Sequence, residues 1–469
     1  MNCPRVIVAG TGSGVGKTSV ALALVSALKR RGWKVQPFKV GPDYLDPTYL
    51  SVAAGRPCYN LDSWMCGKDY VKRLFNEKAR TADMAVIEGV MGLFDGSDPI
   101  GPDGSTGEIA ALLDAPVLLV VNVHGMARSA AAVVKGYVEF QPDVKIRGIV
   151  ANQCGSERHG EWLNESFQAF GLPPKIAAIP SNAFPELPHR HLGLTTADAS
   201  IMSERALAEL VAALETHGSI DSIVEIARNA PPIPDEPVRE QIGRTGRPIR
   251  LGIARDSAFH FYYPDNLEAL SACGCQLVEF SPIQDETLPE SLDCLYIGGG
   301  YPEEHAAELS RNKSMLNAIR EFAASRRAIY AECGGLMYLS QGIEATDGRR
   351  FEMAGLLPHW TRMLERLKSL GYVEVELTRD SLFGGVGTIL RGHEFHYSEL
   401  LRDPVGDGQW CTAYLTKRRL SGTMVPEGFQ RGRVLASYVH AHFASHLGLV
   451  QHFVSTCRAA ARDAESRSQ

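Results

Sequence analysis

A glycine-rich segment near the N-terminus has the composition of a phosphate-binding loop. It follows the apolar run 6–9 and reads Gly10-Thr11-Gly12-Ser13-Gly14-Val15-Gly16-Lys17-Thr18. Small residues let backbone N–H groups close around phosphate oxygens, while Lys17 can reach the terminal phosphates and the Thr18 hydroxyl can bind Mg²⁺. The loop therefore predicts an ATP-type nucleotide site, with the backbone of Gly12, Gly14 and Gly16 among its contacts. It departs from the commonest form, which has glycine where this chain has Thr11, and a glycine-rich turn without a ligand is the alternative.

Carboxylates follow two of the apolar runs. Glu88 ends the run 84–87, and a carboxylate at the C-terminal edge of a parallel strand is where a Mg²⁺ ligand of the nucleotide belongs. Asp43 and Asp46 lie in a proline-rich loop just past another run, and alone they would indicate only a turn. Beside a phosphate loop they become candidates for a metal contact or a substrate contact, and Lys39 becomes a candidate for phosphate.

A different chemistry is indicated around Cys333. The segment 327–339 is typical of a strand, a sharp turn and a helix, with Cys333-Gly334-Gly335 at the turn. A cysteine at such an elbow lies at a helix N-terminus that favours the thiolate, and backbone N–H groups lie nearby for an oxyanion. The glycines 298–300 follow another strand and can supply a second N–H. We expect acyl transfer through a thioester, with Gly299 and Gly334 forming the oxyanion hole.

A general base for this cysteine is found near the C-terminus. The strand-like run 436–443 places His440 and His442 on the same side. His440 can deprotonate Cys333 and later protonate the leaving amine. Glu332 is the nearest carboxylate in sequence, but strand alternation points it away from the Cys333 side, so we do not expect it to take part.

The strands and helices that position these residues are predicted to form an α/β protein. Nearly continuous apolar runs alternate with helical patterns, which indicates parallel strands covered on both faces. The apolar runs of the first half are 35–40, 84–88, 117–123, 146–151 and 175–179. The same alternation of apolar runs and helical patterns begins again at 249–254. We expect two doubly wound domains: an ATP-binding domain 1–230, a proline- and glycine-rich linker 231–248, a second domain 249–450 and a C-terminal tail 451–469.

Composition narrows the class of protein. The 469 residues are too many for one ordinary core, and the net charge of -6 argues against a nucleic-acid surface as the main function. No stretch approaches the roughly 20 apolar residues of a membrane span, so we expect a cytoplasmic protein. The ten cysteines show neither a C-x-x-C pair nor a zinc framework. A homodimer is a candidate assembly.

In combination these motifs resemble known families. The residues 298–303, Cys333-Gly334-Gly335 and His440 resemble the class I glutamine amidotransferase domain of the cobyric-acid-synthase type. The first half resembles the dethiobiotin synthetase fold, which is P-loop NTPase-like. Both halves in this order, with the motifs 38–47, 88–96 and 191–194, resemble the cobyrinic acid a,c-diamide synthase family over almost the whole chain, to about residue 446.

That resemblance implies a reaction and a set of roles. The family amidates the a and c carboxylates of a corrin precursor, cobyrinic acid, in cobalamin biosynthesis, using ATP and glutamine. It implies that glutamine is hydrolysed at Cys333 and that ammonia reaches a carboxylate activated by the γ-phosphate of ATP, as an acyl phosphate. Lys17 and a Mg²⁺ ion on Thr18, Asp43 and Glu88 would neutralise the phosphate charge. Candidates for orienting the corrin are Tyr44, Leu45, Asp46 and Asp95, and Asn152 is a candidate for the adenine edge.

One departure from the family pattern concerns the catalytic histidine. Many glutaminases of this class place a Glu two residues after it, whereas this chain has His442 there. A neutral His stabilises an imidazolium less well than a carboxylate does. We therefore expect a Cys333/His440 dyad and slow glutamine turnover that is compensated by coupling to the synthetase site.

Two other functions stay open at the level of sequence. The first is amidation of a related tetrapyrrole, hydrogenobyrinic acid or nickel sirohydrochlorin, because the sequence does not separate cobalt-bearing, metal-free and nickel-bearing substrates. The second, from another class, is a deviant-Walker positioning ATPase with a non-catalytic C-terminal domain. Those ATPases carry a signature Lys near the start of the loop, where this chain has Gly12. They also need no Cys-Gly-Gly elbow.

Overall fold

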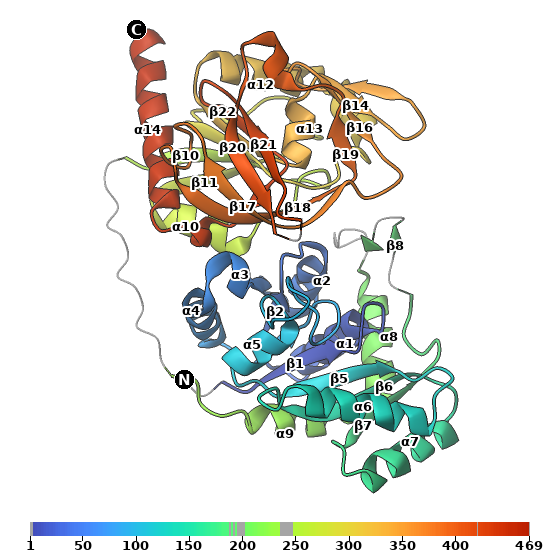
Figure 1. Ribbon diagram of the computed structural model, residues 1–469. Coiled ribbons are helices and arrows are strands. Elements are labelled where there is room, and N and C mark those ends of the chain that lie inside the picture. Colours follow the sequence, from blue (N-terminus) through green and yellow to red (C-terminus); the bar gives the residue numbers. More distant parts are fainter. Residues whose placement is uncertain are drawn as a thin grey trace. The chain divides into compact units, whose positions relative to one another are not determined.

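The computed structural model describes residues 3–186, 189–190, 193–194, 202–234, 247–419 and 421–468. The chain divides into two compact units, Met1–Arg239 and Glu240–Gln469 (Figure 1). The predicted linker 231–248 spans this division, and its residues 235–246 lie outside the described ones. Of the motif 191–194, only Gly193–Leu194 is described, as the short strand β9, which pairs with β8 (His189–Arg190).

The first unit is built on a parallel sheet with the strand order β3-β2-β4-β1-β5-β6-β7. Its strands are β1 (Arg5–Gly10), β2 (Val35–Val40), β3 (Tyr59–Leu61), β4 (Met84–Glu88), β5 (Val117–Asn122), β6 (Ile146–Cys154) and β7 (Lys175–Pro180). The predicted strands of the first half are therefore present. Because β2, β4 and β1 are parallel neighbours, the loops that follow these three strands lie side by side at the same end of the sheet.

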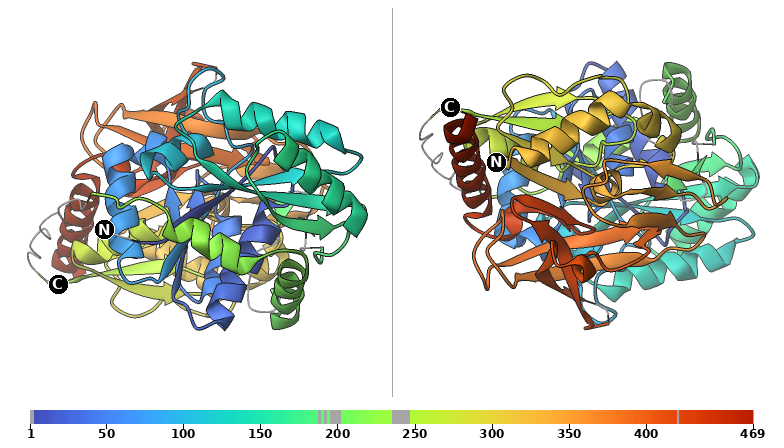
Figure 2. Two further views of the ribbon diagram at one scale, coloured as in Figure 1. Left: turned by 90° about the horizontal axis from the view of Figure 1, so that it is seen from below. Right: turned by 90° about the horizontal axis from the view of Figure 1, so that it is seen from above.

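Helices cover both faces of this sheet (Figures 1 and 2). Val6 and Val8 of β1 point to one face, and Ile7 and Ala9 point to the other. The first face packs on α1 (Lys17–Arg30), α2 (Leu45–Ala54), α8 (Glu204–His217) and α9 (Ile220–Arg228). The second packs on α4 (Lys68–Ala79), α5 (Thr106–Leu112), α6 (Arg128–Phe140) and α7 (Glu157–Ala169), while the short α3 (Ser63–Cys66) precedes α4.

The second unit contains a larger, mixed sheet with the strand order β11-β10-β12-β13-β22-β21-β20-β17-β18-β23. The first five are parallel: β10 (Ile249–Ala254), β11 (Cys275–Phe280), β12 (Cys294–Ile297), β13 (Ala328–Glu332) and β22 (Val434–Ser437). The others continue it antiparallel: β17 (Ser369–Leu377), β18 (Ile389–His396), β20 (Cys411–Arg418), β21 (Met424–Arg431) and β23 (His440–Ala441). This antiparallel half goes beyond the purely doubly wound arrangement that the sequence predicts.

The parallel half of the second unit is also covered on both faces. One face packs on α11 (Ala306–Arg311), α12 (Lys313–Ala324) and α13 (Gly334–Leu339). The other packs on α10 (Pro264–Ala272) and α14 (Leu449–Ser468). A small sheet of β14 (Gly342–Glu344), β15 (Arg350–Glu352), β16 (Trp360–Met363) and β19 (Ser398–Leu400) completes the unit.

The C-terminal segment belongs to this second core. Residues 451–469 are expected from the sequence to be a tail, but residues 451–468 belong to α14, and Phe453, Val454 and Cys457 are buried against the sheet. The apolar positions recur at helical spacing, which explains the packing. Among the helices of the described residues, none combines the length and the apolar character that a membrane crossing needs.

Candidate active sites

The glycine-rich loop of the first unit connects β1 to the N-terminus of α1. Gly14 and Gly16 have φ of 72° and 101°, which explains glycine at these positions. The Lys17 ammonium donates to the carbonyl oxygens of Gly12 (2.8 Å) and Met91 (2.6 Å). Burial lowers the pKa of Lys17, and the neighbouring charge of Lys39 acts in the same direction. The loop thus surrounds a buried cation at a helix N-terminus, an arrangement suited to phosphate.

The carboxylates that the sequence singles out converge on Lys39 beside this loop. The Lys39 ammonium is 3.0 Å from Glu88 Oε1, 2.5 Å from Asp46 Oδ2 and 3.8 Å from Asp43 Oδ2. The Thr18 hydroxyl donates to Glu88 Oε1 at 2.6 Å. Lys39 is the counter-ion of three carboxylates, because a buried charge needs a partner of opposite sign. Its contact with phosphate stays a prediction.

Burial and mutual repulsion alter the acidity of this cluster. Burial, with the charge of Asp46 added, raises the pKa of Glu88 to about 8 and that of Asp43 to about 7. Asp46 is buried as well, yet the ammonium of Lys39 holds the pKa of Asp46 below its usual value. The same carboxylates keep the pKa of Lys39 raised in spite of burial. The cluster therefore carries more acid groups than its single lysine neutralises.

The donors around Thr18 fit a magnesium ion. Hydroxyl and carboxylate oxygens are the ligands that Mg²⁺ prefers, and Glu88 Oε2 is buried without a hydrogen-bond partner. Among the described residues, no group of three or more His, Cys, Asp or Glu side chains is arranged to hold a metal ion.

Other predicted residues of the first unit lie around the same loops. Asn152 donates from Nδ2 to the carbonyl of Val15 at 2.8 Å, and a β-carbon on Gly16 would overlap the Asn152 amide. Asp95 accepts from the N–H of Gly92 at 2.8 Å. Asn152 thus holds the phosphate loop, and its predicted contact with adenine stays a prediction.

The loop between β2 and α2 is fixed by two polar side chains. Asp43 Oδ1 accepts from the N–H of Leu45 at 2.8 Å, and Tyr44 immediately precedes α2. Asn60, which the sequence analysis missed, donates to the carbonyls of Gly41 (2.8 Å) and Asp43 (2.7 Å). A buried Asn in the apolar strand β3, next to the loop after β2, is the signal that would have indicated it.

Cys333 lies at a strained elbow between β13 and α13. Its φ of 48° and ψ of -99° are unusual for a residue with a side chain, and a strained residue at the end of a strand is typical of a nucleophile. Its N–H donates to the carbonyl of Ser437 at 2.7 Å. Burial raises the pKa of its thiol, and the charge of Glu303 adds to the effect. The thiolate preference expected from the helix N-terminus is therefore outweighed in the ligand-free unit.

The glycines of the predicted oxyanion hole lie next to both catalytic candidates. A β-carbon on Gly299 would overlap the His440 ring, so this glycine permits the close approach of the imidazole. A β-carbon on Gly334 would lie 3.1 Å from the backbone nitrogen of Gly300. The loop 298–300 thus touches His440 on one side and the residue after Cys333 on the other. Its role as an oxyanion hole stays a prediction.

His440 lies near a carboxylate that the sequence analysis had set aside. The distance from His440 Nδ1 to Glu332 Oε2 is 3.8 Å, and both side chains are 1% exposed. Alternation does place Glu332 on the face opposite Cys333, with Tyr330. However, β22 ends at Ser437 and β23 pairs with β18 instead, so the chain passes over the end of β13. Glu332 therefore points away from Cys333, as expected from the sequence, but it lies beside His440, which the sequence pattern does not predict.

His442 occupies a different environment from His440. Its Nε2 is 3.3 Å from Asp265 Oδ2, and its ring packs on Tyr263 at 4.6 Å between centroids. The Tyr263 hydroxyl is 3.1 Å from His393 Nδ1, and the His393 ring stacks on His440 at 5.0 Å. His442 therefore interacts with Asp265 of α10, whereas His440 stacks on His393 and lies near Glu332.

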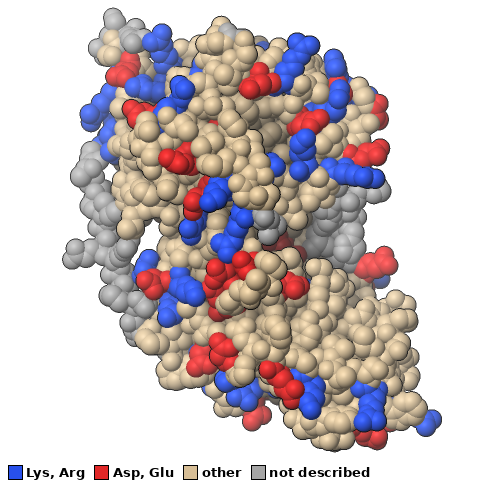
Figure 3. Space-filling model, in the orientation of Figure 1, with Lys and Arg blue, Asp and Glu red and all other residues tan. Residues whose placement is uncertain are grey.

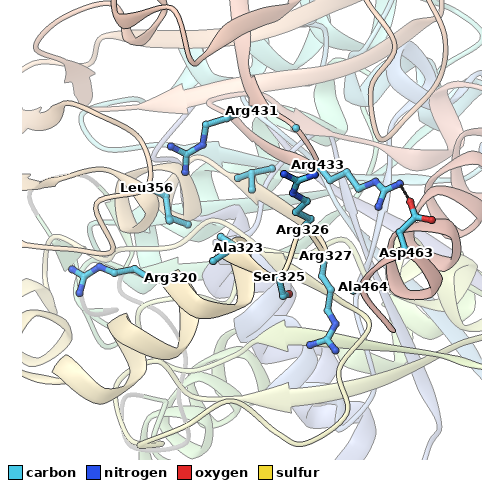
Figure 4. A pocket seen from close by; sticks show the side chains of 13 residues that line it. Arg320, Ala323, Ser325, Arg326, Arg327, Leu356, Arg431, Arg433, Asp463 and Ala464 are labelled. Atoms are coloured by element: carbon cyan, nitrogen blue, oxygen red, sulfur yellow. Dashed lines mark hydrogen bonds and ion pairs between the residues drawn. The ribbon is translucent and has the colours of Figure 1, made fainter. Parts of the chain in front are cut away.

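A pocket of about 620 Å³ lies at the other end of the strands in the second unit (Figure 4). Arg327, directly before β13, and Val434, the first residue of β22, line it, and Arg433 there is bound to Asp463 at 2.6 Å. Its other basic lining residues are Arg320, Arg326, Arg327 and Arg431. None of the predicted site residues lines it, because Cys333 follows the opposite end of β13.

Charge is distributed over the surface in both signs. On the face shown in Figure 3, Lys and Arg side chains are interspersed with Asp and Glu on both units. That face offers no continuous basic surface of the kind that nucleic acid needs.

Comparison with known proteins matches both halves of the chain. A family model described as a CobQ/CobB/MinD/ParA nucleotide binding domain matches residues 6–193, and one described as a CobB/CobQ-like glutamine amidotransferase domain matches residues 250–447. A cobyrinate a,c-diamide synthase of Syntrophotalea carbinolica is 55% identical over 458 residues, which cover 98% of this chain and 99% of that protein. Synthases of the same name from Leptospira interrogans (45%) and Dehalococcoides mccartyi (44%) each match over 97% of this chain and 98% of their own length.

Proposed function

Because the chain belongs to the cobyrinate a,c-diamide synthase family, we propose that it amidates the a and c carboxylates of cobyrinic acid in cobalamin biosynthesis. It is a carbon–nitrogen ligase that uses glutamine as nitrogen donor and ATP as the source of activation. The observation that carries the proposal is the pairing of two sites in one chain. One unit holds a phosphate loop with an acidic cluster, and the other holds a cysteine elbow with a neighbouring histidine.

In the first unit, ATP phosphates are bound by the backbone of Gly12, Gly14 and Gly16 and by Lys17. Thr18, Glu88 and Asp43 would hold Mg²⁺, which supplies positive charge to the phosphates when it is bound. The Lys17 ammonium exchanges the carbonyls of Gly12 and Met91 for phosphate oxygens. A substrate carboxylate attacks the γ-phosphorus, and the product is an acyl phosphate with ADP as leaving group.

The groups that orient the corrin are assigned to the loops beside this cluster. Tyr44, Leu45 and Asp46 lie at the start of α2, and Asp95 lies in the loop after β4. These loops follow the C-terminal ends of parallel strands, where ligands bind in open α/β sheets. Asp46 is bound to Lys39, so a ligand that competes for either group would loosen the cluster.

In the second unit, Cys333 attacks the side-chain amide carbon of glutamine. His440 takes the thiol proton and returns it to the nitrogen, which leaves as ammonia, and water then hydrolyses the thioester to glutamate. The N–H groups of Gly299 and Gly334 stabilise the oxyanion. Ammonia displaces phosphate from the acyl phosphate in the first unit, which forms the amide.

Both nitrogen and activation come from cytoplasmic metabolites, glutamine and ATP, and we place the enzyme in the cytoplasm on this ground. The positioning-ATPase alternative is disfavoured, because the relatives align over both units and the elbow at Cys333 has the strain of a nucleophile. The nature of the macrocycle is the point that an experiment must decide.

The proposed substrate is tested by supplying each macrocycle in turn. The purified chain is incubated with ATP, Mg²⁺ and glutamine and with cobyrinic acid, hydrogenobyrinic acid or nickel sirohydrochlorin, and products are separated by mass. We expect two successive amidations of cobyrinic acid, each accompanied by release of ADP and glutamate. Amidation of only the metal-free or the nickel macrocycle would contradict the proposed substrate, and no amidation of any of them would contradict the proposed reaction.

A further inference from the structure

Glu332 is a buried carboxylate that is surrounded by neutral hydrogen-bond donors. The hydroxyls of Tyr296 and Tyr330 donate to its Oε2 and Oε1 at 2.8 and 2.6 Å, and the N–H of Ala441 donates to Oε1 at 3.1 Å. No Lys or Arg of the described residues lies within ion-pair distance of it. The imidazole of His440, 3.8 Å away, is its one neighbour that can become a cation.

This arrangement holds the Glu332 carboxylate in one orientation. Its two oxygens accept three hydrogen bonds, and the tyrosines fix the carboxylate so that it cannot rotate away. Burying an ionised group is costly unless a charge of opposite sign lies nearby. His440 Nδ1, 3.8 Å from Glu332 Oε2, is placed to supply that charge when the histidine takes up a proton from Cys333.

The other groups around His440 work against such a proton. The ring of His393 on β18 stacks on it at an interplanar angle of 17°, and burial together with the charge of His440 keeps the pKa of His393 well below its usual value. His396 on the same strand and His442, directly after β23, are further titratable neighbours that would repel an imidazolium when they are charged. A negative charge on Glu332 would offset this repulsion.

We propose that Glu332 is the positioning residue of the glutaminase site: it orients His440 through Nδ1 and stabilises the imidazolium that forms when Cys333 loses its proton. The inference rests on the proposed function and deepens it. The proton passes from Cys333 Sγ to His440 as sulfur bonds to the amide carbon, and it leaves with ammonia as the C–N bond breaks. Glu332 remains ionised throughout, as the acid of a triad does.

The structure explains how Glu332, which precedes the nucleophile Cys333 in sequence, comes to lie beside the base His440. The resemblance to class I glutaminases implies a Glu two residues after the histidine, but here that position holds His442, which interacts with Asp265. The chain between β22 and β23 crosses the end of β13 and brings His440 over Glu332. The 3.8 Å separation is longer than a hydrogen bond, and such contacts often tighten only in the substrate complex.

The test compares Glu332→Gln and Glu332→Asp with the parent enzyme. Glu332→Gln keeps the shape and removes the charge; its amide oxygen can accept from one tyrosine hydroxyl, and its NH₂ group can donate to the other. We expect kcat for glutamine hydrolysis to fall by about 10²-fold or more, with KM for glutamine little changed and with amidation from ammonium salts at the parent rate. Glu332→Asp restores the charge and should recover part of kcat.

A pH profile separates positioning from a structural role. The rate of Cys333 alkylation by iodoacetamide reports how readily the thiolate–imidazolium pair forms. In Glu332→Gln the rising limb should move to higher pH by about 1–3 units, because the imidazolium has lost its counter-charge. Asp293→Asn is the matched control: Asp293 is a buried carboxylate at the start of β12, bound to Arg247 at 2.9 Å, and this variant should keep the parent profile.

Several outcomes would overturn the inference. They are a parental kcat and pH profile in Glu332→Gln, an equal shift of the profile in Asp293→Asn, or loss of ammonium-dependent amidation together with glutamine hydrolysis. If Glu332→Gln does not fold, Glu332→Asp decides, since a parental kcat in that shorter side chain contradicts a positioning role. A parent enzyme that hydrolyses no glutamine would instead contradict the proposed function.

Discussion

At the scale of single residues, burial changes the acidity of Cys333 and therefore its dependence on His440. Burial raises the pKa of the Cys333 thiol, and the charge of Glu303 adds to the effect. In the reaction that we propose, proton transfer to His440 activates this cysteine, so we expect a thiol that resists oxidation and alkylation when no glutamine is supplied.

A second buried carboxylate of the same unit gives a prediction about stability. Burial raises the pKa of Glu427 from 4.5 to about 7, although Ser437 and the N–H of Tyr438 donate to it. Its folded pKa exceeds the unfolded one, so the folded state holds the proton longer and the free energy of unfolding falls as pH rises between those values. Glu427→Gln, which mimics the protonated acid, should be more stable than the parent at pH 8 by roughly 1–3 kcal/mol and about equal at pH 4.5.

Thermal unfolding of both proteins across this pH range measures the effect. The difference between the thermal unfolding midpoints of Glu427→Gln and the parent should increase as pH rises. Equal pH dependence in the two proteins would show that Glu427 does not titrate in this window.

The turn between β13 and α13 shows, at the scale of elements, how closely the cysteine elbow packs. A β-carbon on Gly335 would overlap the carbonyl oxygen of Ile297 and lie 3.1 Å from that of Gly298. Backbone atoms cannot move aside as a side chain can, so Gly335→Ala must shift the elbow against the loop that contains Gly299. We expect a loss of stability of about 1–3 kcal/mol and a strong decrease in glutamine hydrolysis.

A matched glycine serves as control for this variant. Gly406 lies in the same unit, and a β-carbon there would meet no atom within 4 Å. Gly406→Ala should leave both the unfolding midpoint and glutamine hydrolysis unchanged. If Gly335→Ala also leaves the unfolding midpoint and glutamine hydrolysis unchanged, the elbow does not pack against the backbone of Ile297 as the structure indicates.

The last helix gives another prediction at this scale. Phe453 of α14 is fully buried and packs with Phe383, Tyr330 and Phe443. Phe453→Ala should destabilise the second unit by about 3–5 kcal/mol through the cavity that it leaves. Ser455→Ala on the exposed side of α14 should stay within about 0.5 kcal/mol of the parent. Similar unfolding midpoints for the two variants would mean that the segment behaves as a tail.

The sequence predicts the parallel strands well because buried strands leave continuous apolar runs, as in 84–88 and 117–123. It does not predict the antiparallel half of the second sheet, since β17 and β18 contain Glu, His and Arg and so leave no continuous apolar run. The position of Glu332 was inferred from alternation along one strand, which is correct but local. Its approach to His440 depends on where β23 pairs, and pairing between distant segments is not visible in a local pattern.

At the scale of the whole molecule, the division into two units implies two separable partial reactions. The acidic cluster around Lys39 lies entirely in the first unit, and the groups around Cys333 lie entirely in the second. Loss of one site should therefore leave the chemistry of the other measurable. Ammonia is the species that joins the two reactions, so supplying it from solution bypasses the second unit.

The most direct measurement is the choice of nitrogen source by Cys333→Ser. Amidation of cobyrinic acid by this variant is compared with glutamine and with ammonium chloride, and Lys17→Ala is run in parallel. We expect Cys333→Ser to lose glutamine-dependent amidation and to keep ammonium-dependent amidation near the parent rate, while Lys17→Ala loses both but still hydrolyses glutamine. Full glutamine-dependent amidation by Cys333→Ser, or loss of its ammonium-dependent amidation in a folded protein, would contradict the division of labour between the two sites.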